Sequence, residues 1–597
     1  MHLENKTMIL LNMVLVLTLV VSLTALPAVN AQASSTVTHA MLTVNPNPVG
    51  VGQRVVIVAW AGLVLPQAAV TNDIRFRDYT ITITKPDGTK ETLKWDIVQD
   101  TTSTVYAEYY PNQIGTYAFV FSYPDQVYTW NATAAMRQWT GHVFLGATSK
   151  TIYLTVQAEP LPNPITSYPL PAEYWTRPIE GQNTDWWTIS SHWLGRTHPS
   201  IVQMYQPAGT APNSPHIMWT KPIDEGGVVG GTNVGVEGNM FYSGLAYNPR
   251  FAEPIIMNGR LFFELPFMNS GTGGGWMCVD LRTGAEIWRN DKMGVDSAWP
   301  RPSFGYLYDC ETENQHGVVP RGILFSSNFG TAYDPWTGQR LFNVTNVPSG
   351  IDVVGPKGEI LRYQINIANR WLAQWNSSRL WTTSGLGWTP DWNETRGWVN
   401  ASLASRYDWN VTIPTTIPTT TSARFAIFND VLIGSTDFRG ASGIGTPDPY
   451  TMWAISLKPE SRGQLMWLKQ YPAPPKNATR FLQARDPVNR VIIFLDKETF
   501  QFSGYSLDNG EKLWETTPPN DISDFSYFDV THAAVFSSVA YGRLYHSGWG
   551  GVLYCYDTQN GKLLWTYGNG GPGNSTFGGL ETPWGNHPIF ISSVADG

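Results

Sequence analysis

Apolar and polar residues alternate strongly between residues 37 and 157. The alternation runs through "QRVVIVAW", "YTITITKPDGTKETLKW", "GTYAFVFSY" and "KTIYLTV". Alternation with a period of two is typical of strands that bury one face. Asp87-Gly88, between two alternating runs, indicates a tight hairpin turn. We therefore predict an all-β sandwich over residues 37–157.

The same region carries a motif that occurs at corners of β-sandwiches. Gly115-Thr116-Tyr117 resembles the glycine-x-tyrosine corner of immunoglobulin-like domains, in which the phenol ties a loop to a strand. The resemblance implies an immunoglobulin-like sandwich, and the cysteine pair of antibody domains is absent here. Residues 158–173 are rich in proline, which predicts a stiff linker after the sandwich.

From residue 174 onward the chain contains an imperfect repeat. Five copies align on their glycines: "CVDLRTGAEIW" (278–288), "AYDPWTGQRLF" (332–342), "AISLKPESRGQLMW" (454–467), "GYSLDNGEKLW" (504–514) and "CYDTQNGKLLW" (555–565). Each copy has a small residue, an Asp or Ser two positions later, a glycine, and a terminal aromatic residue. The residues in these four slots are Cys278, Asp280, Gly284, Trp288, Ala332, Asp334, Gly338, Phe342, Ala454, Ser456, Gly463, Trp467, Gly504, Ser506, Gly510, Trp514, Cys555, Asp557, Gly561 and Trp565.

The residue types in each copy fit a strand, a tight turn and a second strand. Asp or Ser can accept backbone N–H bonds in the turn, and glycine can adopt the positive φ that a tight turn requires. The terminal aromatic can bury a large apolar area. Cys278 and Cys555 occupy a slot that holds alanine or glycine elsewhere, so we predict that both are buried, unpaired packing residues.

The copies recur at the spacing of a propeller blade. Measured at the Asp/Ser slot, the intervals are 54, 122, 50 and 51 residues, and a period of roughly fifty residues matches one four-stranded blade. The double-length interval leaves room for a degenerate blade, which we place at residues 355–375 with Trp375 as its end. Trp219 marks a further predicted blade end upstream.

This pattern resembles the tryptophan-docking motif of PQQ-like β-propeller repeat proteins, the quinoprotein alcohol dehydrogenase-like group. The resemblance covers residues 174–597. It implies a β-sandwich followed by a seven- or eight-bladed β-propeller, in which each terminal Trp docks between neighbouring blades. Seven blade ends can be counted, and residues 589–597 would begin an eighth blade. We therefore expect the propeller to be incomplete at the C-terminus of this chain.

The resemblance also raises a PQQ-dependent dehydrogenase as an alternative function. Members that oxidise alcohols often carry an adjacent cysteine pair, a calcium ion and an Asp base. No two cysteines are adjacent here, and no Cys-x-x-Cys-His haem motif occurs. Calcium ligands in a propeller leave no local spacing to search for. We predict no cofactor, with PQQ and calcium as the alternative, and we assign no catalytic or metal-binding residue.

Three other features were candidates for chemistry. Cys310 has acidic neighbours, which favour the neutral thiol and a structural role. The histidines show no metal-binding spacing. A cluster of four tryptophans could stack on sugar rings, and we prefer to interpret it as blade packing. The histidines in this region are His316, His532, His546 and His587, and the clustered tryptophans are Trp175, Trp186, Trp187 and Trp193.

Eight Asn-x-Ser/Thr sequons occur, of which the three at Asn393, Asn400 and Asn410 cluster before "TIPTTIPTTTS". In a chain rich in Ser and Thr most sequons arise by chance. The cluster nevertheless indicates an exposed, glycosylated excursion from the ring. The other sequons are at Asn131, Asn343, Asn376, Asn477 and Asn574.

The N-terminus indicates export. Lys6 precedes an apolar run over residues 8–28, and Ala31-Gln32-Ala33 has the form of a cleavage site. Residues 1–33 therefore read as a signal peptide, and the length of the run leaves an uncleaved membrane anchor as the alternative. Three cysteines are too few for a disulfide scaffold. A net charge of −8 without a long basic run excludes a nucleic-acid partner.

Together these features favour an exported, non-catalytic binding or scaffold protein at the cell surface or outside the cell. It would present a β-propeller surface to a protein or carbohydrate partner. The alternative is an oxidoreductase that uses PQQ or a related cofactor to act on alcohols or sugars. The sequence favours the first because the repeated residues are explained by packing alone.

Overall fold

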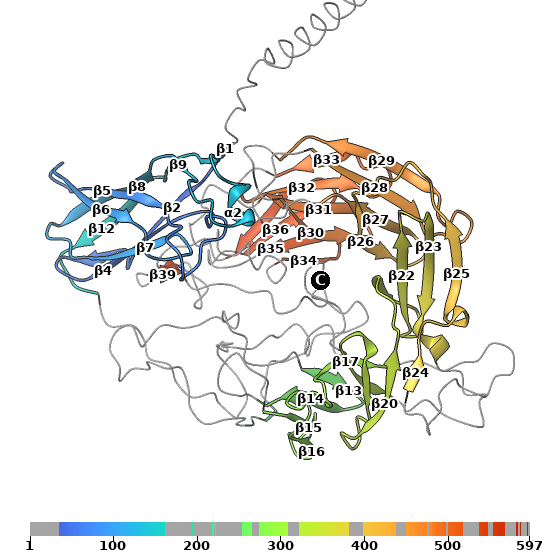
Figure 1. The fold of residues 1–597 in the computed structure, drawn as a ribbon. Helices are drawn as coiled ribbons and strands as arrows, with labels where there is room; N and C mark the ends of the chain where they lie inside the picture. The colour runs from blue at the N-terminus through green and yellow to red at the C-terminus, as the bar shows by residue number, and fades with distance from the viewer. Residues whose placement is uncertain are drawn as a thin grey trace, which may run out of the picture.

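The protein is described from a computed structural model whose regular elements are nearly all strands (Figure 1). The residues that the structure describes are 35–161, 194, 218–219, 221, 254–265, 274–307, 322–380, 398–437, 449–474, 478, 480–496, 499–516, 537–546, 553–567, 581–582, 585–586 and 594. The fold is all-β, as the sequence predicts. It consists of a sandwich followed by a propeller-like series of four-stranded sheets.

The sandwich elements lie between residues 35 and 157. They are β1 (Ser35–Thr36), β2 (Ala40–Asn45), β3 (Val49–Gly50), β4 (Val55–Ala61), β5 (Arg77–Thr84), β6 (Lys90–Ile97), β7 (Thr104–Tyr109), β8 (Gly115–Tyr123), β9 (Gln126–Val127), α2 (Ala134–Arg137), β10 (Val143–Phe144), β11 (Ala147–Thr148) and β12 (Ile152–Gln157). One sheet has the order β2-β4-β7 and the other the order β3-β12-β8-β5-β6, with β11 on β8. A small third sheet has the order β1-β10-β9.

The sandwich core is built by the alternation seen in the sequence. Ile57 of β4 and Ile81 of β5 come from different sheets and belong to one buried cluster, because alternate side chains on each strand point inward. Asp87-Gly88 turns β5 into β6, with Gly88 at φ +84°. The Tyr117 hydroxyl accepts the backbone N–H groups of Asn112 and Gln113. This phenol therefore ties the loop before β8 to the strand.

Within the part of the chain that the structure describes, six further groups of four antiparallel strands follow, named blades 1 to 6 here. Blade 1 comprises β13 (Ile255–Met257), β14 (Arg260–Glu264), β15 (Trp276–Asp280) and β16 (Glu286–Asn290); blade 2 comprises β17 (Pro302–Tyr306), β18 (Ile323–Ser326), β19 (Thr331–Tyr333) and β20 (Arg340–Thr345). Blade 3 comprises β21 (Ile351–Val354), β22 (Ile360–Asn366), β23 (Trp371–Asn376) and β25 (Tyr407–Thr412); blade 4 comprises β26 (Ser422–Ile427), β27 (Val431–Ser435), β28 (Tyr450–Ser456) and β29 (Leu465–Tyr471). Blade 5 comprises β30 (Arg480–Asp486), β31 (Val491–Asp496), β32 (Gln501–Ser506) and β33 (Lys512–Glu515); blade 6 comprises β34 (Ser537–Ala540), β35 (Arg543–His546), β36 (Leu553–Asp557) and β37 (Leu563–Tyr567).

Smaller elements complete the described structure. They are the 3-10 helices η3 (Ser327–Phe329), η4 (Ser377–Leu380) and η5 (Ala404–Arg406), the strand β24 (Trp398–Asn400), and the two-stranded pair β38 (Glu581–Thr582) and β39 (Gly585–Asn586).

The blades follow one another around an arc (Figure 1). First strands of neighbouring blades contact each other, as β21 contacts β26 and β30 contacts β34. The largest buried apolar clusters of this region lie between blades. One cluster joins Phe342 of blade 2 to Ile360 of blade 3, and another joins Leu495 of blade 5 to Leu544 of blade 6. Each blade therefore buries its faces against its neighbours, as stacked repeats do.

Blade 3 differs from the prediction at two points. Trp375 was expected to end a blade, yet it lies on β23, the third strand, and β25 is the fourth. The chain between these two strands was expected to be an exposed excursion, yet β24 pairs in parallel with β20 of blade 2. Val399 and Ala401 are fully buried. Part of this long insertion is therefore packed against blade 2 by strand pairing and apolar burial. The local sequence does not predict this packing, because it depends on a distant strand.

A buried histidine lies in the core between blades 5 and 6. His546 is 1% exposed, and its ring contacts the rings of Phe500 and Phe502. Its Nδ1 is 2.6 Å from the Ser537 hydroxyl, whereas its Nε2 has no hydrogen-bond partner among the described residues. Burial lowers the pKa of His546 from 6.5 to about 3. The folded protein therefore holds this ring in its neutral form.

We predict that acid weakens the protein partly through this residue. The unfolded chain gains a proton on His546 near pH 6.5, while the folded chain gains it only near pH 3. The stability linked to His546 is therefore complete above pH 6.5 and is lost as the pH falls toward 3, by about 1.4 kcal/mol per pH unit. Denaturant unfolding at about pH 7 and about pH 5 should show a smaller acid effect in His546→Phe than in the native protein. Equal acid sensitivity would contradict this.

Candidate functional site

The first slot of the repeat faces the last slot across each hairpin. The cross-strand pairs are Cys278 with Trp288, Ala332 with Phe342, Ala454 with Trp467, Gly504 with Trp514, and Cys555 with Trp565. In every copy a register shift follows the small residue. In blade 5 the approach leaves no room for a side chain, because a Cβ added to Gly504 would lie 2.2 Å from the Trp514 ring. The slot is small because the aromatic side chain lies over it.

The tryptophan of one blade reaches the turn of the next. Trp288 Nε1 donates to the carbonyl oxygen of Pro335 at 3.0 Å, Trp467 Nε1 to Leu507 at 2.8 Å, and Trp514 Nε1 to Thr558 at 2.8 Å. In each case the acceptor is the residue directly after the Asp/Ser slot of the following copy. The three indoles are 7–9% exposed, so each buried N–H has the partner that its burial requires.

The glycine slot forms part of the same contact between neighbouring blades, which is called a seam below. Gly338, Gly510 and Gly561 have φ between +67° and +72°, a conformation that other residues rarely adopt. A Cβ on each would lie 2.5–2.8 Å from the tryptophan ring of the preceding blade. Glycine is therefore required both by the turn and by the indole that lies against it. Gly284 receives Trp219 in the same way, and Trp219 Nε1 donates to Leu281 O at 3.0 Å.

The Asp/Ser slot closes the turn that the indole contacts. The Asp280 carboxylate accepts the backbone N–H groups of Arg282 and Thr283, and Asp334 and Asp557 each accept one N–H two residues on. Ser456 and Ser506 accept equivalent bonds through their hydroxyls. These side chains hold the turn in shape, as short polar residues commonly do.

The arrangement is missing at three places. Blade 2 ends in Phe342, which packs against blade 3 in a buried cluster and has no indole N–H to donate. Gly463 of blade 4 meets Val411 and the carbonyl of Thr412 in place of an indole, since β25 ends blade 3 without a docking tryptophan. At blade 6, Trp565 is 40% exposed, and its indole nitrogen has no hydrogen bond to a described residue. The expectation that each terminal Trp lies buried between blades is therefore wrong for Trp565. No blade that follows blade 6 lies within the described residues.

The two cysteines of the repeat are packing residues. Cys278 and Cys555 are buried and unpaired, as predicted. Burial raises the pKa of the Cys278 thiol to about 12 and that of Cys555 to about 11. Both thiols are therefore neutral near pH 7 and poor nucleophiles.

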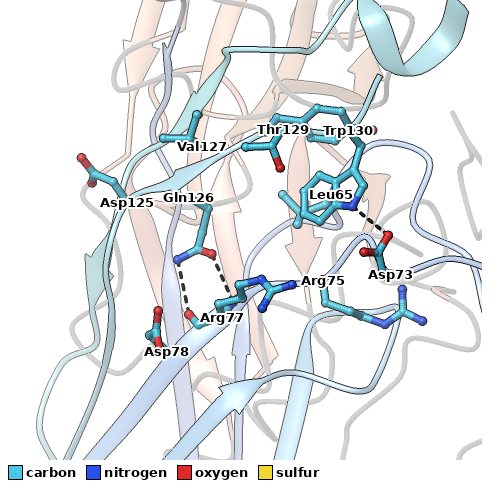
Figure 2. A pocket seen from close by; sticks show the side chains of 11 residues that line it. Leu65, Asp73, Arg75, Arg77, Asp78, Asp125, Gln126, Val127, Thr129 and Trp130 are labelled. Carbon is cyan, nitrogen blue, oxygen red and sulfur yellow. Dashed lines mark hydrogen bonds between the residues drawn. The ribbon is translucent and has the colours of Figure 1, made fainter. Parts of the chain in front are cut away.

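A separate cavity of about 320 Å³ lies in the sandwich (Figure 2). It is formed by the loop before β5 together with the first residues of β5, and by the segment around β9. The lining residues are Leu65, Asp73, Arg75, Arg77, Asp78, Asp125, Gln126, Val127, Tyr128, Thr129 and Trp130. None of these residues belongs to a local sequence motif, because they come from segments about fifty positions apart.

Hydrogen bonds fix the walls of this cavity. Trp130 Nε1 donates to Asp73 at 2.8 Å, and Gln126 bonds both the backbone N–H and the backbone C=O of Arg77. Arg75 donates to three backbone carbonyls, those of Gln99, Ile74 and Ala69. The two segments are thereby joined by side chains that line the cavity.

Several predicted features lie outside the described residues. These are the N-terminal segment 1–33, most of the linker, Cys310, His316, His532, His587, the four clustered tryptophans, the sequons at Asn393, Asn477 and Asn574, and nearly all of residues 589–597. Within the part of the chain that the structure describes, no helix is long and apolar enough to cross a membrane. The same part contains no group of three or more His, Cys, Asp or Glu residues arranged to hold a metal ion.

Comparison with known proteins gives only distant similarity. No family model and no curated protein matches the chain. Among solved structures, BamB from Moraxella catarrhalis is 11% identical over 54% of this chain and 74% of its own, with a TM-score of 0.26. The computationally designed Ika8 protein is 10% identical over 54% of this chain and 87% of its own, with a TM-score of 0.25. The quinohemoprotein alcohol dehydrogenase ADHIIG from Pseudomonas putida HK5 is 13% identical over 54% of this chain and 42% of its own, with a TM-score of 0.20.

The seam geometry predicts unequal effects of two substitutions in neighbouring blades. Trp514→Ala should lower the free energy of unfolding by roughly 3–5 kcal/mol, because it empties a buried seam and removes the bond to Thr558. Cys555→Ala, the matched control, should cost little because Ala332 and Ala454 fill the same slot. Thermal melts of the two variants test this. Equal melting temperatures would show that Trp514 does not hold the seam.

Proposed function

We propose that this chain is an exported, non-catalytic binding or scaffold protein that offers its blades and sandwich to a protein or carbohydrate partner. The observation that supports this most directly is that the repeated residues form turns and contacts between blades. The Asp or Ser and the glycine of each copy shape a turn, and the small residue and the tryptophan pack within and between blades. Residues that recur in every copy thus build a rigid frame, and their recurrence needs no reaction to explain it.

Export is proposed from the N-terminal sequence. The apolar run over residues 8–28 and the Ala31-Gln32-Ala33 site are typical of a secretory signal. The protein would then work outside the cell or at its surface, with an uncleaved N-terminal segment as one means of membrane attachment. Buried, unpaired Cys278 and Cys555 are compatible with such a location because neither thiol is accessible to pairing.

The alternative function is a PQQ-like oxidoreductase, and it rests on the resemblance of the repeat to the tryptophan-docking motif. That motif builds the seams and does not itself contact a cofactor. Membership of the PQQ-like group is therefore proposed for the architecture of the blades, and the chemistry of its enzymes is not carried over with it.

Fractionation of the native host tests the export proposal. We expect the protein in the extracellular or cell-surface fraction, with its N-terminus at Ser34 when the signal is removed at Ala33. Retention of the whole segment in a membrane fraction would identify an anchor. Recovery from the cytoplasm with an intact N-terminus would contradict export.

Reconstitution tests the absence of PQQ chemistry. Purified protein incubated with PQQ and calcium should show no tight binding in calorimetry and no substrate-dependent dye reduction with alcohols or sugars. The reason is that no adjacent cysteine pair or haem motif supports that chemistry. Submicromolar PQQ binding together with dye reduction would replace the scaffold proposal with the oxidoreductase.

A further inference from the structure

The cavity in the sandwich holds five charged side chains that do not pair with one another. Arg75 and Arg77 lie with Asp73, Asp78 and Asp125 along its lining, and none of the five makes an ion pair with a described residue. Opposite charges gathered in a small space usually pair or attract counter-charges. Because these arginines and aspartates do not pair with one another here, guanidinium donors and carboxylate acceptors line the same cavity.

Two of these side chains have no hydrogen bond to any described residue. The Arg77 guanidinium is exposed, and this residue bonds to Gln126 only through its backbone. Asp78 is exposed, and its carboxylate has no hydrogen-bond partner among the described residues. Asp125 uses one oxygen to accept the backbone N–H of Gly146 and keeps the other available. The cavity therefore presents free N–H groups and free carboxylate oxygens together.

The backbone at Asp78 is held in an unusual conformation. Its φ is +58°, a left-handed value inside strand β5, where neighbouring residues are extended. Such values carry a cost and recur at binding and active sites. Asp78 lies at one side of the cavity in Figure 2, whereas Asp73 and Trp130 lie at the other.

Trp130 supplies a fixed aromatic wall. Its indole is half-buried, its Nε1 is bound to Asp73 at 2.8 Å, and its ring meets the Tyr128 ring edge-on at 5.1 Å between centroids. Tyr128 is itself held by its hydroxyl, which donates to Pro66 O at 2.9 Å. An indole that is restrained in this way can stack on a flat, weakly polar ring without losing much freedom on binding.

We propose that this cavity is a binding site for a neutral saccharide. Sugar hydroxyls donate to carboxylates and accept from guanidinium groups, so one ligand can satisfy Asp78, Asp125 and Arg77 together. The C–H face of a pyranose ring suits the Trp130 indole. An anionic ligand would face three carboxylates and a cationic ligand two guanidinium groups, and either arrangement carries repulsion.

The size of the cavity agrees with this ligand class. Its volume of about 320 Å³ falls at the lower end of the range for small-molecule sites, roughly 300–1,000 Å³. One or two sugar rings of a longer chain would therefore be held, with the rest of the chain outside. This inference rests on the proposed binding function and names one of its ligand classes. It does not depend on how many blades the propeller has.

The test is calorimetry and NMR titration of the full chain with neutral trisaccharides of glucose, mannose, galactose and N-acetylglucosamine. A galacturonate trisaccharide and a cationic peptide serve as the other ligand classes. We expect at least one neutral trisaccharide to bind. Arg77→Gln and Trp130→Ala should each weaken this binding by about ten-fold or more, and Trp130→Phe should weaken it less because it keeps a stacking ring.

Matched controls lie on the same sandwich away from the cavity. Arg54→Gln removes a half-buried arginine that pairs with Glu108, and Tyr106→Ala removes an exposed aromatic side chain. Both should leave saccharide affinity within about two-fold, and thermal melts should confirm that every variant is folded.

Three results would overturn the proposal: no neutral trisaccharide binding at about 10 mM, tighter binding of the galacturonate trisaccharide or the cationic peptide, or binding that Arg77→Gln and Trp130→Ala leave unchanged. These results would leave the export and PQQ measurements untouched, so failure of this inference is distinguishable from failure of the proposed function.

Discussion

The hydrogen bond from a tryptophan indole to a carbonyl of the next blade is the interaction around which three of the five described contacts between blades are built. At the seams of Trp288, Trp467 and Trp514, one side chain joins three features: a small residue beneath it, a glycine against it, and a carbonyl that accepts its N–H. The indole is buried, so its N–H would carry a desolvation cost without that acceptor. The turn geometry, and through it the Asp/Ser slot, is therefore coupled to packing between blades.

The seam between blades 3 and 4 shows what replaces the indole when it is missing. Apolar side chains of both blades, including Tyr363 and Trp453, form one buried cluster there. The Arg462 guanidinium lies 5.2 Å from the centre of the Trp409 ring, a contact of the cation–π type. Apolar burial can thus join two blades without the docking bond, and the long insertion before β25 is accommodated at this irregular position.

The seams and the sandwich cavity differ in whether their polar groups have hydrogen-bond partners. In the seams nearly every polar group of the repeat has a partner, and the glycine and tryptophan positions leave no free space. In the cavity the side chains of Arg77 and Asp78 have no hydrogen-bond partner among the described residues, although Gln126, Arg75 and Trp130 are restrained around them. Satisfied networks give rigidity, whereas restrained walls with free polar groups are what a binding site needs. The blades therefore act as a frame, and the sandwich carries the stronger candidate for recognition.

The sequence by itself determined the elements that depend on local chemistry. Alternation predicted the sandwich strands, Asp87-Gly88 predicted a hairpin, and the spacing of small residue, Asp or Ser, glycine and aromatic predicted the outer hairpin of every described blade except blade 3. Tertiary structure alone decided that Trp375 belongs to a third strand, that β24 joins blade 2, and that Trp565 is exposed. It alone also brought Arg77 and Trp130 to one cavity. Turn and strand preferences act over a few residues and can be read locally, whereas strand partners and cavity walls depend on which distant segments bury each other's surface.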